Sequence, residues 1–358
     1  MSLKPTGLTG VVDKGLCTFC GACLASCPRR VLVPIDESLF LAAYKYTSRY
    51  WCFSCGVCYD QCPLTAFSTD EAESKLFGRP REKGEELGIH RGYYVAHSTR
   101  SDILNVAQDG GVVTSILAYA LKSEKVDCSI VSGTREDSPW KPWPMAVTTY
   151  DDLIRSAGSK YTPSPVLYGL IPAVNRYGKH KIAVVGTPCN IWGIRKMQIS
   201  RHRLFNSKLA EAVKLTIGIF CLEAYTYAKL IRYIQDQGID QKAVSRFEIR
   251  EGRFIANIGE RKAIDVPVKN LKTLARECCH HCTDYAAELA DISVGGVGCP
   301  HGSSIVILRS EEGEELFKEA RNAGFLEYRE ISEDSLEVAE NLKLAKFKRK
   351  KAIMPHIP

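Results

Sequence analysis

The sequence predicts two domains, a small cysteine-rich domain followed by a larger domain of mixed α/β class, with an α/β or α+β arrangement of its strands. Two observations lead to this prediction. Eight of the fifteen cysteines lie in two copies of one motif near the N-terminus. Beyond Gly92, short apolar runs rich in β-branched residues alternate with helical patterns, which is typical of a sheet covered by helices.

The cysteine motif has the spacing of an iron–sulfur binding sequence. Three cysteines are separated by two residues each, a fourth follows three residues later before a proline, and the pattern recurs 35 residues further on. In two-cluster ferredoxins, the fourth cysteine of each motif binds the other cluster. We therefore predict a ferredoxin-like domain at residues 1–74 with two [4Fe–4S] clusters. The first would be held by Cys17, Cys20, Cys23 and Cys62, and the second by Cys52, Cys55, Cys58 and Cys27.

Structural zinc sites are the alternative interpretation of CxxC pairs. Zinc uses two pairs with a longer spacer between them, and not two identical sets of three plus one.

An odd cysteine count argues against a complete disulfide framework, and the N-terminus lacks the apolar core of a signal peptide. We therefore expect a cytoplasmic iron–sulfur protein.

Composition and charge restrict the function further. A hydrophobic content of 45% and a charged content of 25% are those of an ordinary globular protein. No apolar run approaches the roughly 20 residues that span a bilayer, so no membrane span is expected. The net charge is +7 without a basic stripe interleaved with aromatics. This net charge does not by itself indicate nucleic-acid binding, and it is compatible with an anionic cofactor or an acidic partner.

The larger domain is expected over residues 92–340, after a charged linker at 75–91 that contains glycine and proline and lacks apolar periodicity. Residues 341–358 are expected to form a basic tail, either solvated or docked against an acidic partner subunit. Strands are predicted at 93–98, 126–133, 181–186, 215–221, 290–296 and 303–308. Helices are predicted at 112–121, 227–238 and 314–324.

Four further cysteines lie near the ends of predicted strands. One strand runs into Cys189, another ends on Cys221, and a CxxC pair, Cys279 and Cys282, precedes the strand at 290–296. Ligands of open α/β sheets gather at the carboxyl ends of the strands. The four thiols therefore predict a third [4Fe–4S] cluster, inside the larger domain.

Alternatives remain open for this third site. A lone cysteine in an apolar strand is more often a small buried hydrophobe, which we expect for Cys128. Zinc bound by Cys279, Cys282 and one of the two histidines between them, His280 or His281, is a competing interpretation.

Two other cysteines affect the choice of ligands. Cys279 is preferred over its neighbour Cys278 only because of the usual two-residue spacer. Cys299, which precedes a proline, could replace one of the four.

Two polar loops are candidate contacts for a phosphate or another anion. Two glycines precede the helix at 112–121, and free amides at a helix N-terminus can bind phosphate. A second loop places a lysine among hydroxyl groups. Either loop could instead be an ordinary turn, and no GxGxxG, P-loop or GxSxG motif is present. The candidate residues of the two loops are Gly110, Gly111, Thr114, Ser115, Ser159, Lys160 and Tyr161.

Together these motifs resemble those of the coenzyme F420 hydrogenase/dehydrogenase β-subunit family. They are AQDGGVVTSILAYAL, AGSKY, VVGTPCNIWGIRK, IGIFC and CCHHCTDYAAELADISVGG, in the family's order over roughly residues 92–310. The resemblance implies that the larger domain is a flavin-binding domain, with FAD held by the seven loop residues above. It also implies that coenzyme F420 is the substrate and that the third cluster is held by Cys189, Cys221, Cys279 and Cys282.

The resemblance further implies an activity. The protein would oxidise reduced F420 by hydride transfer to FAD and pass single electrons through three [4Fe–4S] clusters. The acceptor would be ferredoxin or a membrane-bound F420H2 dehydrogenase complex, at whose cytoplasmic face the chain would be the electron-input subunit. Arg195 or Lys196 is a candidate for binding the anionic F420 tail. The alternatives are the β subunit of another F420-linked enzyme, such as a hydrogenase or formate dehydrogenase, and a non-catalytic electron-relay subunit without flavin.

Overall fold

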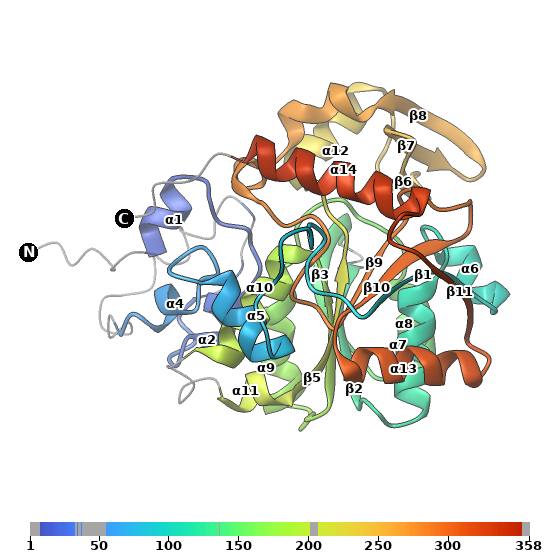
Figure 1. The fold of residues 1–358 in the computed structure, drawn as a ribbon. Helices are drawn as coiled ribbons and strands as arrows, with labels where there is room; N and C mark the ends of the chain where they lie inside the picture. Colours follow the sequence, from blue (N-terminus) through green and yellow to red (C-terminus); the bar gives the residue numbers. More distant parts are fainter. Residues whose placement is uncertain are drawn as a thin grey trace, which may run out of the picture.

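An eight-stranded mixed sheet forms the centre of the protein (Figure 1). The structure is a computed structural model that describes residues 8–32, 34, 37, 55–135, 137–200 and 207–352. The strand order is β11-β1-β10-β9-β5-β4-β2-β3, in which β9, β5, β4 and β2 are parallel and the other pairs antiparallel. The strands are β1 (Gly92–Ser98), β2 (Cys128–Arg135), β3 (Ser138–Val147), β4 (Ile182–Gly186), β5 (Val213–Ile219), β9 (Ile292–Gly295), β10 (Ser304–Leu308) and β11 (Leu326–Ile331).

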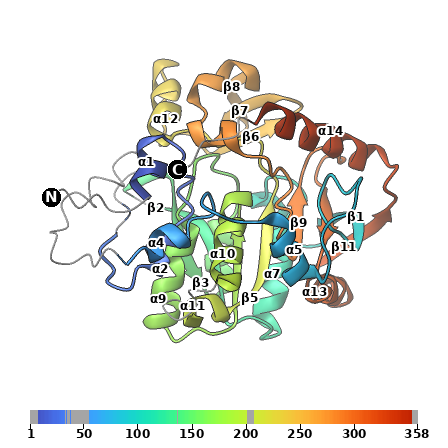
Figure 2. The same cartoon turned by 60° about the vertical axis from the view of Figure 1, so that its left-hand side comes forward.

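Helices cover both faces of this sheet, as Figures 1 and 2 show. Alternate residues of β1 enter different cores: Tyr94 packs with the helices of one face, and Tyr93 packs beneath the C-terminal helix on the other. The first face carries α7 (Val112–Lys122), α8 (Tyr150–Ser156) and α13 (Glu311–Asn322), with α6 (Ser101–Val106) beside α8. The second carries α9 (Leu170–Asn175), α10 (Pro188–Ile199), α11 (Ser207–Ala212) and α14 (Leu336–Lys351).

The mixed α/β class predicted from the sequence is confirmed. Each of the six predicted strands overlaps a strand of the large sheet, and the three predicted helices correspond to α7, α12 (Tyr227–Asp236) and α13. The agreement reflects the apolar runs, which must be buried on both faces of a parallel sheet. The four parallel strands direct their carboxyl ends to one edge of the sheet.

A second, three-stranded antiparallel sheet was not predicted. It consists of β6 (Arg246–Arg250), β7 (Arg253–Ile258) and β8 (Arg261–Pro267), and it packs with α12 around the aromatic rings of Phe247 and Phe254. Glu251 and Gly252 both have positive φ, which suits the tight turn of a hairpin. The strands are rich in arginine and too polar to stand out as apolar runs.

The N-terminal cysteine-rich segment is folded against the larger domain. It contains α1 (Leu8–Asp13), α2 (Ala22–Ser26), α4 (Val57–Asp60) and α5 (Thr69–Phe77). It has a small core of its own, and it also contributes Ala22 and Ala25 to the core beneath α9 and α10. Gly21 is required at this contact, because a Cβ there would lie 2.8 Å from the backbone nitrogen of Tyr168. The boundary between the two domains stays a prediction.

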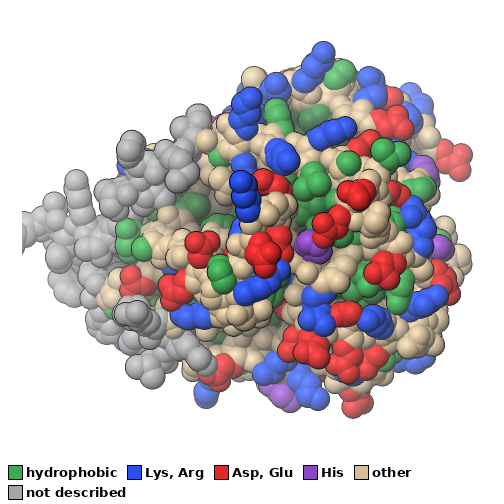
Figure 3. Space-filling model, viewed as in Figure 1, with side chains coloured by type: hydrophobic (Ala, Val, Ile, Leu, Met, Phe, Trp, Pro, Cys, Tyr) green, Lys and Arg blue, Asp and Glu red, His purple; other side chains and the backbone are tan. Residues whose placement is uncertain are grey.

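The predicted linker and tail are both packed segments. Residues 69–77 form α5, and the chain beyond it is held against the larger domain by the ion pair of Arg81 with Glu288 at 2.7 Å. The basic run at the C-terminus belongs to α14, in which Lys348 is buried. On the face shown in Figure 3, acidic and basic side chains are interspersed. Among the described residues, no helix combines the length and the apolar character needed to cross a bilayer.

Candidate functional site

The first predicted cluster site is an apolar cavity. Cys17, Cys20, Cys23 and Cys62 line it together with apolar side chains such as those of Val11 and Leu24. Burial raises the pKa of the Cys62 thiol to about 11, so a bound cation is needed to hold it as a thiolate at neutral pH. Four thiols in a dry pocket fit an iron–sulfur cube, whose iron supplies that positive charge. The assignment of this set to one cluster stays a prediction.

The second predicted set is described only in part. Cys27 is buried, Cys58 is half-buried and Cys55 is exposed, whereas Cys52 lies outside the described residues. Cys58 is near enough to Cys23 for its charge to affect that thiol. The two sets of the repeated motif are therefore neighbours.

The third predicted set begins at the carboxyl edge of the large sheet. β4 ends at Gly186, and Thr187 caps α10 through reciprocal hydrogen bonds with Asn190, which places Cys189 in the first helical turn. The hydroxyl of Thr187 lies 3.2 Å from the sulfur of Cys189. β5 is parallel to β4 and ends two residues before Cys221, so both thiols lie at this edge.

A short 3-10 helix, η4 (Glu277–His281), brings the remaining two thiols to the same place. The backbone nitrogen of Ala224 donates to the sulfur of Cys279 at 3.3 Å, and that of Cys221 donates to the carbonyl of Tyr285 at 2.9 Å. The loop after β5 is thus tied on both sides to the segment that contains Cys282.

The four thiols of the third set are electrostatic neighbours. Burial raises the pKa of Cys221, Lys348 lowers it, and the three other thiols raise it again. Among the described residues, no three Cys, His, Asp or Glu side chains lie close enough together to bind one metal ion. A four-iron cube takes one thiolate at each corner, so its ligands stand farther apart than those of a single zinc ion. The arrangement fits a cube, and the ligand set stays a prediction.

Three further cysteines of the larger domain were not assigned to the third set. Cys278 is buried, and a hydrogen bond from its thiol lowers the pKa of Cys279 to about 6. Cys299 packs under α14 with the residues around Tyr285. Cys128 is fully buried in β2, as expected for a small hydrophobe.

The third set lies directly beside the first. Asn190 donates to the carbonyl of Cys20 at 3.5 Å, and a Cβ added to Gly193 would lie 3.3 Å from the sulfur of Cys20. The charge of Cys189 also affects the Cys20 thiol. Helix α10 therefore begins at one candidate cluster and runs along the other.

Lys348 is a site residue that the sequence reasoning missed. Its side chain reaches from α14 to the third set, where its Nζ donates to the carbonyl of Cys221 at 2.5 Å. The buried face of α14 contains Val338, Asn341, Ala345 and Lys348, at helical spacing. The helical spacing of these four residues could have indicated that Lys348 is buried. It was overlooked because the basic residues around it suggested a solvated tail.

The two glycines of the first candidate cofactor loop are enclosed by protein atoms. A Cβ on Gly110 would lie 2.7 Å from the carbonyl oxygen of Ala96. Gly111, directly before α7, has a φ of 67°, and a Cβ there would lie 2.7 Å from Ile103. Thr114 is buried, and the buried Ser115 donates its hydroxyl hydrogen to Ser98. These residues shape the loop through packing.

The second candidate loop is held just as firmly. Lys160 donates to the carbonyls of Ser156, Ala157 and Gly158 at the end of α8, and burial lowers its pKa to about 8. The hydroxyl of Tyr161 accepts a hydrogen bond from the backbone nitrogen of Ile249 in β6. The ammonium of Lys160 is therefore engaged within the protein.

Buried polar groups without partners lie beside both loops. The side-chain nitrogen and oxygen of Gln108 make no hydrogen bond, and neither do the hydroxyls of Thr162 and Ser164. The loops meet where a Cβ on Gly158 would lie 3.5 Å from the carbonyl of Val106. Buried polar groups are nearly always paired, so these atoms fit a site for a bound polar cofactor. The sequence reasoning did not assign Gln108, Thr162 or Ser164.

The expectation that Arg195 or Lys196 binds the F420 tail was wrong. The guanidinium of Arg195 is buried and bonds to Asp291, Thr216 and the carbonyl of Leu289. The amine of Lys196 is buried and donates to Thr65 and to the carbonyl of Cys62 at 2.6 Å. Both side chains are occupied within the protein.

We expect the Lys196→Met variant to lose about 3 kcal/mol of stability, because the buried acceptors at Cys62 and Thr65 would lose their donor. Equilibrium urea unfolding measures this loss. The matched control is Lys208→Met, since Lys208 is an exposed lysine on α11 whose replacement should change stability by less than about 0.5 kcal/mol. Equal stabilities of the two variants would contradict the anchoring role of Lys196.

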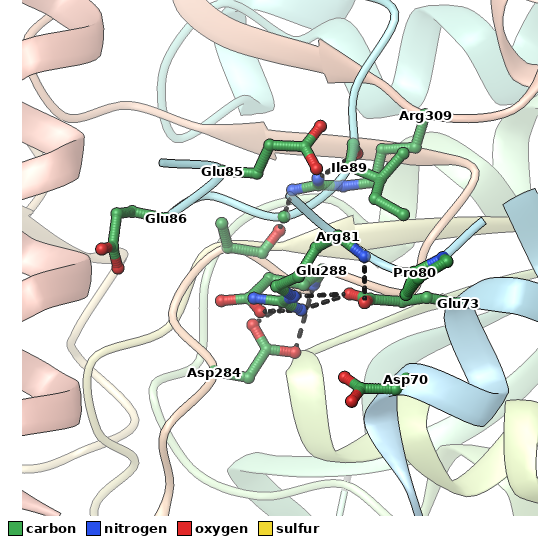
Figure 4. A network of polar contacts seen from close by, with 12 residues as sticks. Asp70, Glu73, Pro80, Arg81, Glu85, Glu86, Ile89, Asp284, Glu288 and Arg309 are labelled. Atoms are coloured by element: carbon green, nitrogen blue, oxygen red, sulfur yellow. Dashed lines mark hydrogen bonds and ion pairs between the residues drawn. The ribbon is translucent and has the colours of Figure 1, made fainter. Parts of the chain in front are cut away.

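An ionic network beside the third set joins distant parts of the chain (Figure 4). Glu288 contacts Arg81 at 2.7 Å and Arg349 of α14 at 2.5 Å, and Arg81 also binds the fully buried Glu73 of α5. The backbone nitrogen of Glu288 donates to Asp284, two residues beyond the CxxC pair. The network thus fixes both α5 and α14 against the candidate cluster.

Comparison with known families divides the chain into three matching parts. Residues 16–67 match the 4Fe-4S dicluster domain. Residues 93–170 match the N-terminal part, and residues 179–334 the C-terminal part, of the coenzyme F420 hydrogenase/dehydrogenase beta subunit.

Relatives and a solved structure agree with these matches. The chain is 37% identical over 267 residues to coenzyme F420 hydrogenase subunit beta of Methanothermobacter thermautotrophicus, which covers 74% of this chain and 94% of the relative. It is 29% identical to a subunit of the F(420)H(2) dehydrogenase of Methanosarcina mazei, over 97% of this chain and 93% of the relative. It is 35% identical to the coenzyme F420-dependent sulfite reductase of Methanocaldococcus jannaschii, over 96% of this chain but only 51% of that relative.

One solved structure that this chain resembles is a chain of the F420-reducing [NiFe] hydrogenase complex from Methanosarcina barkeri, solved as a xenon derivative. The TM-score is 0.71 at 32% sequence identity, and the match covers 76% of this chain and 92% of the neighbour.

Proposed function

The chain belongs to the coenzyme F420 hydrogenase/dehydrogenase beta subunit family, and on this basis we propose that it oxidises reduced coenzyme F420 and delivers single electrons to a partner. The proposed cofactors are FAD and three [4Fe–4S] clusters. The observation that supports this most strongly is the convergence of four cysteines from separate segments beside Cys20 of the repeated motif.

The cofactors would supply the redox chemistry, since a flavin can take up two electrons as a hydride whereas iron–sulfur cubes carry one electron at a time. The protein's task is placement. Helix α10 holds Cys189 at one end and lies along Cys20, which keeps the two candidate sites at a fixed separation. Cys55, in the second predicted set, is exposed, and we propose that a partner takes up electrons there.

We propose that the flavin lies where the two polar loops meet. Residues proposed to hold it are Gly110, Gly111, Thr114, Ser115, Ser159, Lys160 and Tyr161. Because Lys160 and Ser115 bond within the protein, their contribution would be to hold the loops in shape. The unpaired side chains of Gln108, Thr162 and Ser164 are the groups best placed to bond to the cofactor.

Ferredoxin and a membrane-bound dehydrogenase complex are both proposed acceptors. Relatives of similar length carry the names of F420 hydrogenase and F420H2 dehydrogenase subunits, and the chain corresponds to about half of an F420-dependent sulfite reductase. Use of F420 is common to these names, whereas the second substrate differs. A role as the beta subunit of another F420-linked enzyme is therefore the second candidate.

We expect iron-replete protein, purified without oxygen, to reduce a viologen dye with reduced F420 as the donor. Absorbance of oxidised F420 and of reduced viologen would rise together, with two dye molecules reduced for each F420 because the donor gives two electrons. Flavin released on denaturation separates this function from that of an electron relay without flavin. Protein that contains FAD and all its clusters but gives no turnover would contradict the proposal.

A further inference from the structure

Among the lysines and arginines of the C-terminal basic run, residues 343–351, Lys348 is the one whose side chain is buried. The neighbouring lysines of the same helix, Lys346 and Lys350, are exposed, whereas Lys348 has only 6% of its surface exposed. Its position in α14 is fixed on both sides, because Ala345 is buried in the core and Arg349 binds Glu288. The ammonium is therefore held at one place.

The surroundings of this ammonium are the four thiols of the third set. Its one described hydrogen bond is to the carbonyl of Cys221, and the thiols of Cys189, Cys221, Cys279 and Cys282 all lie within electrostatic range of it. The ion pairs found among the described residues do not include Lys348, although the carboxylate of Asp284 is within electrostatic range. A buried ammonium without a carboxylate partner is costly unless other negative charge faces it. Thiolates of a bound cluster would supply that charge.

We propose that Lys348 is the fixed counter-charge of the third cluster and raises its reduction potential. Reduction adds one electron, and hence one negative charge, to the cluster, and a positive charge held beside it favours the reduced form. The electron comes from reduced F420, so the inference rests on the proposed function. The family match ends at residue 334, so it does not include this lysine.

The test is a redox titration of full-length, iron-replete protein, followed by electron paramagnetic resonance. Lys348→Gln removes the charge but keeps an N–H donor for the carbonyl of Cys221, and Lys348→Met removes both. In each variant the equilibrium constant for reducing the third cluster should fall about tenfold, which is about 59 mV for a one-electron couple. The two other clusters should keep their potentials, and the exposed control Lys350→Met should behave as wild type.

A wild-type potential of the third cluster in a fully loaded Lys348→Gln variant would overturn the inference. If Lys348→Met fails to hold the cluster, Lys348→Gln alone decides the outcome. If the wild-type protein shows no signal from a third cluster, both the proposed cluster site and this inference are contradicted. The failure of the inference alone is therefore distinguishable from the failure of the proposed function.

Discussion

We expect the Cys221→Ala variant to lose about four iron atoms per chain and to lose the reduction of viologen by reduced F420. Cys221 is the thiol that β5 delivers to the edge of the sheet, and a cube with three remaining ligands is poorly held. The two clusters proposed for the repeated N-terminal motif are bound by other cysteines and should remain. Iron quantification gives the loss, and electron paramagnetic resonance shows which signals persist.

The control for this variant is Cys299→Ala. Cys299 is a half-buried cysteine that packs near α14. With Cys278, it is one of the two cysteines that the sequence left open as alternative ligands. Its replacement should leave the iron content unchanged. Loss of iron from Cys299→Ala, with full iron in Cys221→Ala, would assign the ligand to Cys299 and contradict the proposed set.

The second large effect is expected on stability. Replacing Glu288 by alanine should cost about 3 kcal/mol, because Arg81 and Arg349 each lose a charge-assisted hydrogen bond. Each arginine keeps one other carboxylate, Glu73 for Arg81 and Glu86 for Arg349. The Glu288 side chain is 5% exposed, and its carboxylate contacts both Arg81 and Arg349. Since these two arginines join the segment after α5 to α14, the loss should also weaken the packing of α14 over the third set. Equilibrium urea unfolding provides the measurement.

The chain offers a matched control in Glu86→Ala. Glu86 contacts the same Arg349 at 2.6 Å, but its side chain is 38% exposed. Exposed ion pairs contribute about 1 kcal/mol or less, so this variant should remain close to wild type. A loss for Glu288→Ala no larger than that for Glu86→Ala would show that burial of the network does not stabilise the protein.

The part of the fold that could be predicted is the part built from apolar strands. Runs such as those of β4 and β5 are buried on both faces, so their composition alone marks them. The strands of the second sheet begin with Arg246, Arg253 and Arg261, and their stability depends on packing with α12, which no local pattern shows. Tertiary packing also decides that Arg195 points inward.

The candidate site was predictable to a similar degree. Cysteine spacing and strand ends pointed to the candidate thiols, and the structure brings those of the third set into one region. Lys348 and Gln108 could not be found in this way. The role of Lys348 depends on where α14 crosses the sheet, and that of Gln108 on its lack of any partner in the folded chain.

Anomalous diffraction from crystals of the iron-replete protein at the iron absorption edge tests the central claim most directly. We predict three separate iron sites, with one of them enclosed by Cys189, Cys221, Cys279 and Cys282 and adjacent to the site that contains Cys20. No iron signal between those four sulfurs, or a signal there that appears only at the zinc edge, would contradict the claim.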